Sequence, residues 1–242
     1  MLLRSITKHV KDQNWFAVAL DFFIVVIGVF IGLQVANWNE AREDRNLERE
    51  YLTRLQAELK ISVEENKDYL NTWRKRVSAL SEVASYFNGE SNGKELGKTH
   101  CEAIVRSHLF SGEIALPATI SELQSTGRLT LISDDSIRNQ IVQFSRAVDR
   151  FLLLNVDIQG HRVTLDSLYP ELITRFPTGD MSGATCRFSE MDRSPAFIND
   201  FSGNYARFSA YFRVIMKAQQ DQRYALLEAL NKSAIENSAR AK

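Results

Sequence analysis

The sequence "ALDFFIVVIGVFIGLQVANWNE", residues 19–40, is an apolar run that contains only one formally charged side chain before its final residue, Asp21. From Trp15 to Ala36 there are about 22 residues, which span roughly 33 Å as a helix, enough to cross a bilayer core of about 30 Å. The run is longer than the apolar part of a signal peptide, and no small-residue cleavage site follows it. It therefore predicts an uncleaved transmembrane helix over residues 15–37.

Aromatic and amide side chains mark both ends of this run. Trp15 precedes it and Trp38 follows it, as amphipathic rings do at the two headgroup interfaces of a bilayer. The polar residues that accompany Trp38 and are predicted to anchor the helix at the interface are Gln34, Asn37 and Asn39. The lipid bilayer is thus the first partner that the sequence predicts.

One side of the predicted span combines an acid with small residues. Asp21, Val25, Gly28 and Gly32 follow one another at steps of four, three and four, which places them on one helical stripe. The glycines give the small-xxx-small spacing that lets helix backbones approach closely in lipid. We expect this stripe to contact a second copy of the chain, another membrane protein, or both. Asp21 has three interpretations: an interfacial carboxylate, a hydrogen bond across a helix pair, or the ion-coupling carboxylate of a stator-like or channel subunit.

The orientation in the membrane does not follow from charge alone. Three basic residues lie close to each end of the span, so the positive-inside rule gives a tie. Cys101 and Cys186, both beyond the span, favour an oxidising compartment if they are bonded, although two free thiols in a cytosolic core would fit the sequence as well. We expect a bacterial inner-membrane protein with a cytoplasmic tail, residues 1–14, and a periplasmic C-terminal part.

Composition indicates an all-α protein. The chain has 242 residues, only 4 Pro and 11 Gly, and no long strand-like alternation. A continuous helix is predicted over residues 38–88, and the remainder of a bundle of about four or five helices over residues 89–242. Because Lys plus Arg and Asp plus Glu both number 30 and are interleaved, no nucleic-acid partner is predicted.

The long helix after the membrane carries a heptad seam, a repeat in steps of three and four. Its members are Leu52, Gln56, Leu59, Val63, Asn66, Leu70, Trp73, Val77, Leu80, Ala84 and Phe87. Such a seam either forms a coiled coil with a copy of itself or packs on later helices of its own chain. The sequence leaves both open.

Further helix signals lie in the second half of the chain. Thr119 and Glu122 have the spacing of a capping box for a short helix that ends at Gly127. Ser133, Asp134 and Asp135 are predicted to cap a longer helix that continues to about Leu168. A polar loop follows, then a helix from Ser194 and Pro195, and a final helix after Gly203.

No catalytic or cofactor motif accompanies these helices. The sequence contains no nucleophile elbow, phosphate loop, HExxH or paired zinc motif, and His100, Cys101 and His108 lack a second ligand cluster. We therefore predict no catalytic residue, metal or cofactor. The predicted function is that of a non-enzymatic scaffold or accessory subunit, with a small-molecule sensor bundle as a further alternative to the ion-coupled subunit.

Two stretches resemble a known family. The run "DFFIVVIGVFIGLQVANWNEARED" together with "ISELQSTGRLTLISDDSIRNQIVQF" is similar to a family of small bacterial single-pass membrane proteins of unknown function. The likeness covers about the first sixty residues and positions 119–145, and elsewhere extends only to helical character. It implies an N-terminal anchor and a helical domain but no reaction. Beyond the residues at the membrane helix, the positions that match the family pattern, without an assigned role, include Glu122, Gly127, Asp135 and Arg138.

Overall fold

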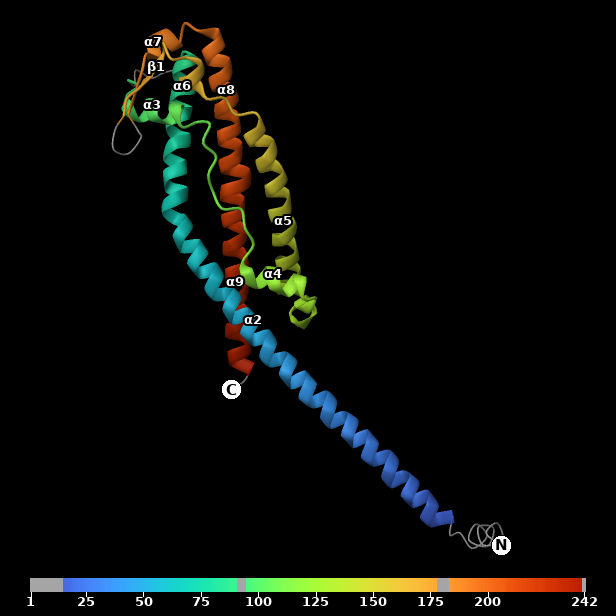
Figure 1. Cartoon of the computed structure of the whole chain (residues 1–242). Coiled ribbons are helices and arrows are strands. Elements are labelled where there is room, and N and C mark those ends of the chain that lie inside the picture. Colours follow the sequence, from blue (N-terminus) through green and yellow to red (C-terminus); the bar gives the residue numbers. More distant parts are fainter. Residues whose placement is uncertain (1–14, 91–94, 178–182, 241–242) are drawn as a thin grey trace, which may run out of the picture. The chain divides into compact units, whose positions relative to one another are not determined.

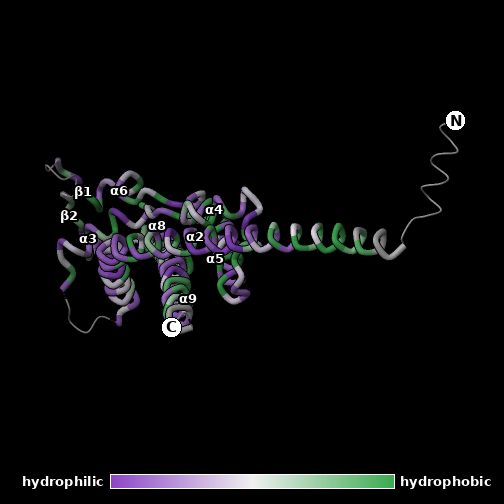
Figure 2. The backbone as a smooth tube through the Cα atoms, turned by 90° about the horizontal axis from the view of Figure 1, so that it is seen from below, coloured by the Kyte–Doolittle hydropathy of each residue, from purple (hydrophilic) through white to green (hydrophobic). Residues whose placement is uncertain are grey.

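A computed structural model describes residues 15–90, 95–177 and 183–240, and it divides the chain into two compact units that meet after Tyr51. The first unit is helical and contains the start of α2, Trp15–Phe87. All side chains from Phe22 to Glu40 are exposed, and Figure 2 shows the hydrophobic character of this part of the helix. By length and composition, α2 is the one described helix that could cross a membrane.

The second unit, from Leu52 onward, is mostly helical with almost no strands, which confirms the all-α prediction (Figure 1). After α2 its elements are α3 Lys98–Val105, α4 Ala118–Ser125, the 3₁₀ helix η1 Arg128–Leu131, α5 Asp135–Gly160, α6 Leu165–Leu168, β1 Ile173–Arg175, β2 Ala184–Cys186, α7 Phe188–Met191, α8 Pro195–Ala210, the π-helical η2 Tyr211–Lys217 and α9 Ala218–Arg240.

The seam of α2 packs on later helices of the same chain. Trp73 is almost fully buried, and its ring stacks on Phe208 of α8 and Tyr211 of η2. Further along, the Gln220 side chain of α9 donates a hydrogen bond to the Val63 carbonyl at 3.1 Å. Of the two alternatives that the heptad pattern left open, the structure therefore shows the intramolecular one.

The buried face of α2 is also wider than a coiled-coil seam. Leu55, Ala79 and Val83 lie outside the heptad positions and are nevertheless buried. A helix that packs against several neighbours needs a broad apolar stripe, whereas a two-stranded coiled coil uses a narrow one. The wide stripe is consistent with α2 being one wall of a globular bundle.

The C-terminal run has no break at Gly203. Helix α8 begins as predicted, with the Ser194 hydroxyl accepting a hydrogen bond from the Phe197 amide at 3.3 Å and Pro195 in the first turn. It then continues through Gly203 into η2 and α9. A glycine inside a helix costs only about 1 kcal/mol, and the buried aromatic residues around it offset that cost. The predicted start of a separate helix after Gly203 is wrong.

Helix α5 is shorter than predicted. It ends at Gly160 and not near Leu168, and a separate short α6 follows. Buried Asn204 of α8 holds the connection: its side-chain oxygen accepts from the Val163 amide at 3.1 Å and its amide donates to the Val163 carbonyl at 2.7 Å. These side-chain hydrogen bonds replace the backbone pairing that a continuing helix would provide.

The region predicted as a polar loop contains a small antiparallel hairpin. Strand β1 pairs with β2 so that Ile173 lies opposite Cys186. Cys186 forms a disulfide with Cys101 of α3, with the two Cα atoms 5.5 Å apart. The bond ties the hairpin to α3 across 85 residues of sequence.

An extended segment, residues 109–117, connects α3 to α4 and is called the strap below. Figure 1 shows it as a green trace that runs along α9 between α2 and α5. The Tyr69 hydroxyl of α2 donates a hydrogen bond to the Ser111 carbonyl of the strap. On its other side the strap contacts η2, where a side chain at Gly112 would collide with Met216. The strap is thus a packed part of the bundle.

Candidate functional site

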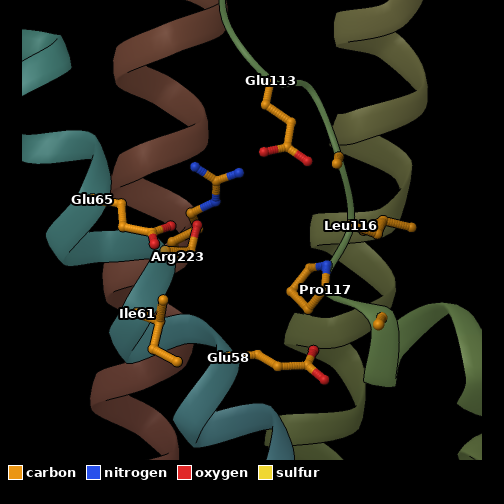
Figure 3. A pocket seen from close by; sticks show the side chains of 10 residues that line it. Glu58, Ile61, Glu65, Glu113, Leu116, Pro117 and Arg223 are labelled. Carbon is orange, nitrogen blue, oxygen red and sulfur yellow. The ribbon is translucent and has the colours of Figure 1, made fainter.

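An open pocket of about 330 Å³ lies among α2, the strap and α9 (Figure 3). Helix α2 contributes Glu58 and Glu65 to its lining, the strap contributes Glu113, and α9 contributes Arg223. Apolar groups of Ile61, Leu116 and Pro117 complete much of the wall. The pocket lies wholly within the second unit.

Arg223 is the buried charge of this pocket. Only 5% of the residue is exposed, and its Nε atom has no hydrogen-bond partner within the described part of the chain. Figure 3 shows its guanidinium directed into the pocket, toward Glu113. Burial lowers the pKa of Arg223, and the negative charge of Glu113 opposes that shift. A guanidinium group stays protonated in proteins, so Arg223 carries a positive charge.

The carboxylates around Arg223 differ in how they are held. Glu58 accepts two hydrogen bonds from Thr119 at the start of α4, one from the hydroxyl at 2.7 Å and one from the backbone amide at 3.1 Å. Glu65 and Glu113 are exposed side chains with no hydrogen bond described to either. The pocket therefore contains one buried cation, Arg223, and two exposed carboxylates, Glu65 and Glu113, that are less constrained than Glu58.

Two glutamines of α9 fix the walls around Arg223. With its amide oriented so that both groups are satisfied, Gln219 donates to the Glu113 carbonyl at 3.0 Å and accepts from the Ala115 amide at 3.3 Å. Gln220 binds the backbone of α2, as described above. Since Gln219 and Arg223 are one helical turn apart, the glutamine that holds the strap also sets the position of the strap relative to the guanidinium.

Glu122, one of the family-pattern residues, lies on α4 but does not cap the helix. Pro117 occupies the N-cap position of α4, and Thr119 is already engaged with Glu58. Glu122 instead forms an ion pair with Arg54 of α2, and the Arg54 Nε also donates to the Thr119 hydroxyl at 2.8 Å. The predicted capping box is wrong because its two side chains bind α2.

The remaining family-pattern residues, Gly127, Asp135 and Arg138, lie between the end of α4 and the first turn of α5. Asp134 is the N-cap, and its carboxylate accepts from the Ser136 and Ile137 amides, at 2.8 and 3.1 Å. Asp135, interpreted above as part of the cap, instead pairs with Arg138. Gly127 has φ of 69°, the left-handed conformation that favours glycine after a helix. These residues have local structural partners, and none of them lines the pocket.

The predicted membrane contact face belongs to the first unit. Val25 is 63% exposed, and within the described part of the chain no heavy atom beyond the adjacent residues and the helix's own nearby backbone lies within 4 Å of a Cβ built on Gly28 or Gly32. The side chains of Asp21 and Trp15 lie outside the described residues. The other predicted interface anchors, Gln34, Asn37, Trp38 and Asn39, are all exposed.

Sequence reasoning missed the pocket residues, although α9 contains a signal. The buried stripe of the C-terminal run passes through Phe212, Ile215, Gln219, Arg223 and Leu226, at steps of three and four. Two polar residues thus occupy consecutive positions of an apolar face, which is unusual enough to mark a buried polar site. Glu58, Glu65 and Glu113 gave no comparable signal, because acids on exposed helices and loops are common.

Among the residues that the structure describes, no group of three or more His, Cys, Asp or Glu side chains is arranged to hold a metal ion. Because Cys101 and Cys186 form a disulfide, the described residues include no free thiol. Comparison of the chain with known proteins finds no matching family model, curated protein or solved structure.

Proposed function

We propose that this chain is a membrane-anchored, non-enzymatic scaffold or accessory subunit that acts through helix-mediated assembly. The observation that carries the proposal is the exposed apolar stretch of α2 from Phe22 to Trp38, in which every side chain is exposed, including those of Phe22, Phe23, Phe30 and Trp38. A surface of this kind is stable in water only when a bilayer or another protein covers it. In a bilayer, residues 15–37 are long enough to span the apolar core.

The small-residue stripe supports assembly in the membrane. Because the backbone at Gly28 and Gly32 is uncovered, a second helix can approach it without displacing a side chain. In lipid, such close backbone packing is a main source of helix association, since burial of apolar surface gives no gain there. The proposed partners are a second copy of the chain or another membrane protein.

The structure of the helical unit argues against self-association through a coiled coil of its long helix. It favours a role in which the membrane helix displays the helical unit on one side of the membrane. Its seam is occupied by α8, η2 and α9 of the same chain, so it is not available for a coiled coil. The disulfide between Cys101 and Cys186 favours an oxidising compartment. We propose that the unit is displayed in the periplasm from a bacterial inner membrane.

Site-directed crosslinking in cells tests the assembly. Single cysteines are placed at Val25, Gly28 or Gly32, with Val26 and Phe30 on the opposite side as matched controls. The native cysteines are kept, because Cys101 and Cys186 are bonded to each other and leave no thiol that could react with the crosslinker. We expect adducts only from the stripe, and mass spectrometry then distinguishes a dimer from an adduct to another membrane protein. Equal crosslinking on both sides, or none, would contradict helix-mediated assembly.

A second candidate function, small-molecule sensing, is favoured by one observation, the pocket around Arg223. A helical bundle that binds a ligand between its elements and is fixed to a membrane helix has the parts that a receptor subunit needs. This candidate does not conflict with assembly, because the pocket and the membrane stripe use different residues.

A further inference from the structure

We propose that the pocket among α2, the strap and α9 binds a small zwitterion, in the simplest case a free α-amino acid. In this arrangement the carboxylate of the ligand binds Arg223, and its ammonium group lies between Glu65 and Glu113. The inference is independent of the proposed role in assembly, because it uses no residue of the proposed membrane span, residues 15–37.

The buried guanidinium calls for an anion. Only 5% of Arg223 is exposed, and its side chain points into the pocket. Its Nε has no hydrogen-bond partner within the described residues. The exposed carboxylate of Glu113 offsets only part of the cost of burying this charge. The planar fork of a guanidinium matches a carboxylate through two parallel hydrogen bonds. A ligand carboxylate would complete this site.

The surrounding acids exclude a simple anion as the best ligand. Glu58, Glu65 and Glu113 line the same pocket, so an anion on Arg223 meets carboxylates nearby. Glu58 is held by Thr119, whereas the exposed side chains of Glu65 and Glu113 accept no described hydrogen bond and can turn to an ammonium group. The charge of Glu113 also acts on Arg223. A simple cation, conversely, meets the charge of Arg223. Only a ligand with both charges gains from both sets of groups.

The dimensions and the apolar wall limit the rest of the ligand. A volume of about 330 Å³ is at the small end of ligand pockets and suits a molecule of amino-acid size. Ile61, Leu116 and Pro117 offer apolar contacts to a side chain. We therefore expect an uncharged side chain to bind better than a charged one.

Thermal unfolding of the full chain in detergent micelles is the first test. Each proteinogenic L-amino acid is added in turn at about 10 mM, a concentration that raises Tm by about 5 °C or more if Kd is near 0.1 mM. We expect at least one amino acid with an uncharged side chain to raise Tm in this way. If none raises it, the inference is wrong.

Half-ligands then test the pairing of charges. For the amino acid that raises Tm most, the corresponding carboxylic acid without the amino group and the amine without the carboxylate are titrated by calorimetry. Each is expected to bind at least about tenfold more weakly, because each leaves one charged group of the pocket unpaired. Binding of either half-ligand as tight as that of the whole amino acid would overturn the assignment.

Variants of the pocket are expected to reverse which half-ligand binds better. Loss of a residue with a purely structural role would not cause this reversal. Arg223→Met is expected to abolish binding of the amino acid and to improve binding of the amine. Glu65→Gln combined with Glu113→Gln alters only exposed side chains and is expected to favour the carboxylic acid instead. Arg213→Met, an exposed arginine of the same helical run, is the matched control and should leave all three affinities unchanged. Unaltered half-ligand preference in both pocket variants would refute the proposed contacts.

Discussion

The indole ring of Trp73 stacks on the phenyl ring of Phe208, with ring centroids 4.4 Å apart and planes inclined by 11°. Tyr211 lies against the same indole at 5.1 Å. The three rings join α2 to the π-helical turn between α8 and α9, and the Arg76 guanidinium lies 5.9 Å from the indole centroid. This aromatic cluster is therefore one of the contacts through which the long helix becomes part of the bundle.

Replacement of Trp73 by alanine is expected to lower the free energy of unfolding by about 3–5 kcal/mol, the usual range for truncation of a fully buried aromatic side chain. Urea unfolding of the full chain, followed by circular dichroism, measures the change. Leu153→Ala is the matched control, because Leu153 is 75% exposed and should change stability by less than about 0.5 kcal/mol. A similar small effect for both variants would show that the cluster does not hold α2.

Asn204→Leu is expected to destabilise the second unit by about 1–3 kcal/mol, because the part-buried amide and carbonyl of Val163 and the buried hydroxyl of Ser107 lose their partner. Asn204 bonds both backbone groups of Val163 and also donates to the Ser107 hydroxyl at 3.0 Å. Urea unfolding gives the loss, and hydrogen exchange of the Val163 amide gives its local cause. An amide as protected in the variant as in the parent protein would argue against this role.

The disulfide between Cys101 and Cys186 is expected to contribute about 2–5 kcal/mol, since it closes a long loop of the unfolded chain. Addition of a reductant should therefore lower Tm of the parent protein. The variant with serine at both positions should already have the lower Tm and show no further response. A parent protein whose Tm is unaffected after complete reduction, checked by thiol labelling, would disprove this contribution.

The helical class of the fold was predictable because it depends on long, local patterns. The apolar run near the N-terminus, the spacing of apolar residues along α2 and the Ser194–Pro195 start of α8 are each contained in a short window. Such patterns give the type of an element more reliably than its ends. Two glycines show why helix ends are harder to predict. Gly203 lies inside helix α8, whereas Gly160 is the last residue of α5.

The pocket was not predictable because it depends on long-range contacts. Arg223, Glu65 and Glu113 line one pocket only because α2 and the strap both pack beside α9, and Thr119 binds Glu58 across 61 residues of sequence. The same competition defeated the predicted capping box, since Thr119 and Glu122 find stronger partners on α2 than in their own helix. Sequence-local patterns show which interactions a side chain is able to form, whereas tertiary contacts determine which of them it forms in the folded protein.

Tyr211 gives the bundle a dependence on alkaline pH. Burial raises the pKa of its hydroxyl from 10 to about 12, because the phenolate would lose its hydration in the core. In the unfolded chain the hydroxyl titrates near 10. Between these two values the folded state holds the proton and the unfolded state releases it, so rising pH favours unfolding.

The stabilising contribution of Tyr211 is therefore fully present below pH 10 and is lost as pH rises toward about 12. Tyr211→Phe removes the titrating group but keeps most of the ring packing, so the free energy of unfolding of the variant should fall less steeply between pH 10 and pH 12. Urea unfolding at a series of pH values measures both slopes. Tyr224→Phe, at a 43% exposed tyrosine of α9, serves as the control. Identical slopes for the parent protein and Tyr211→Phe would mean that Tyr211 does not hold its proton in the folded bundle.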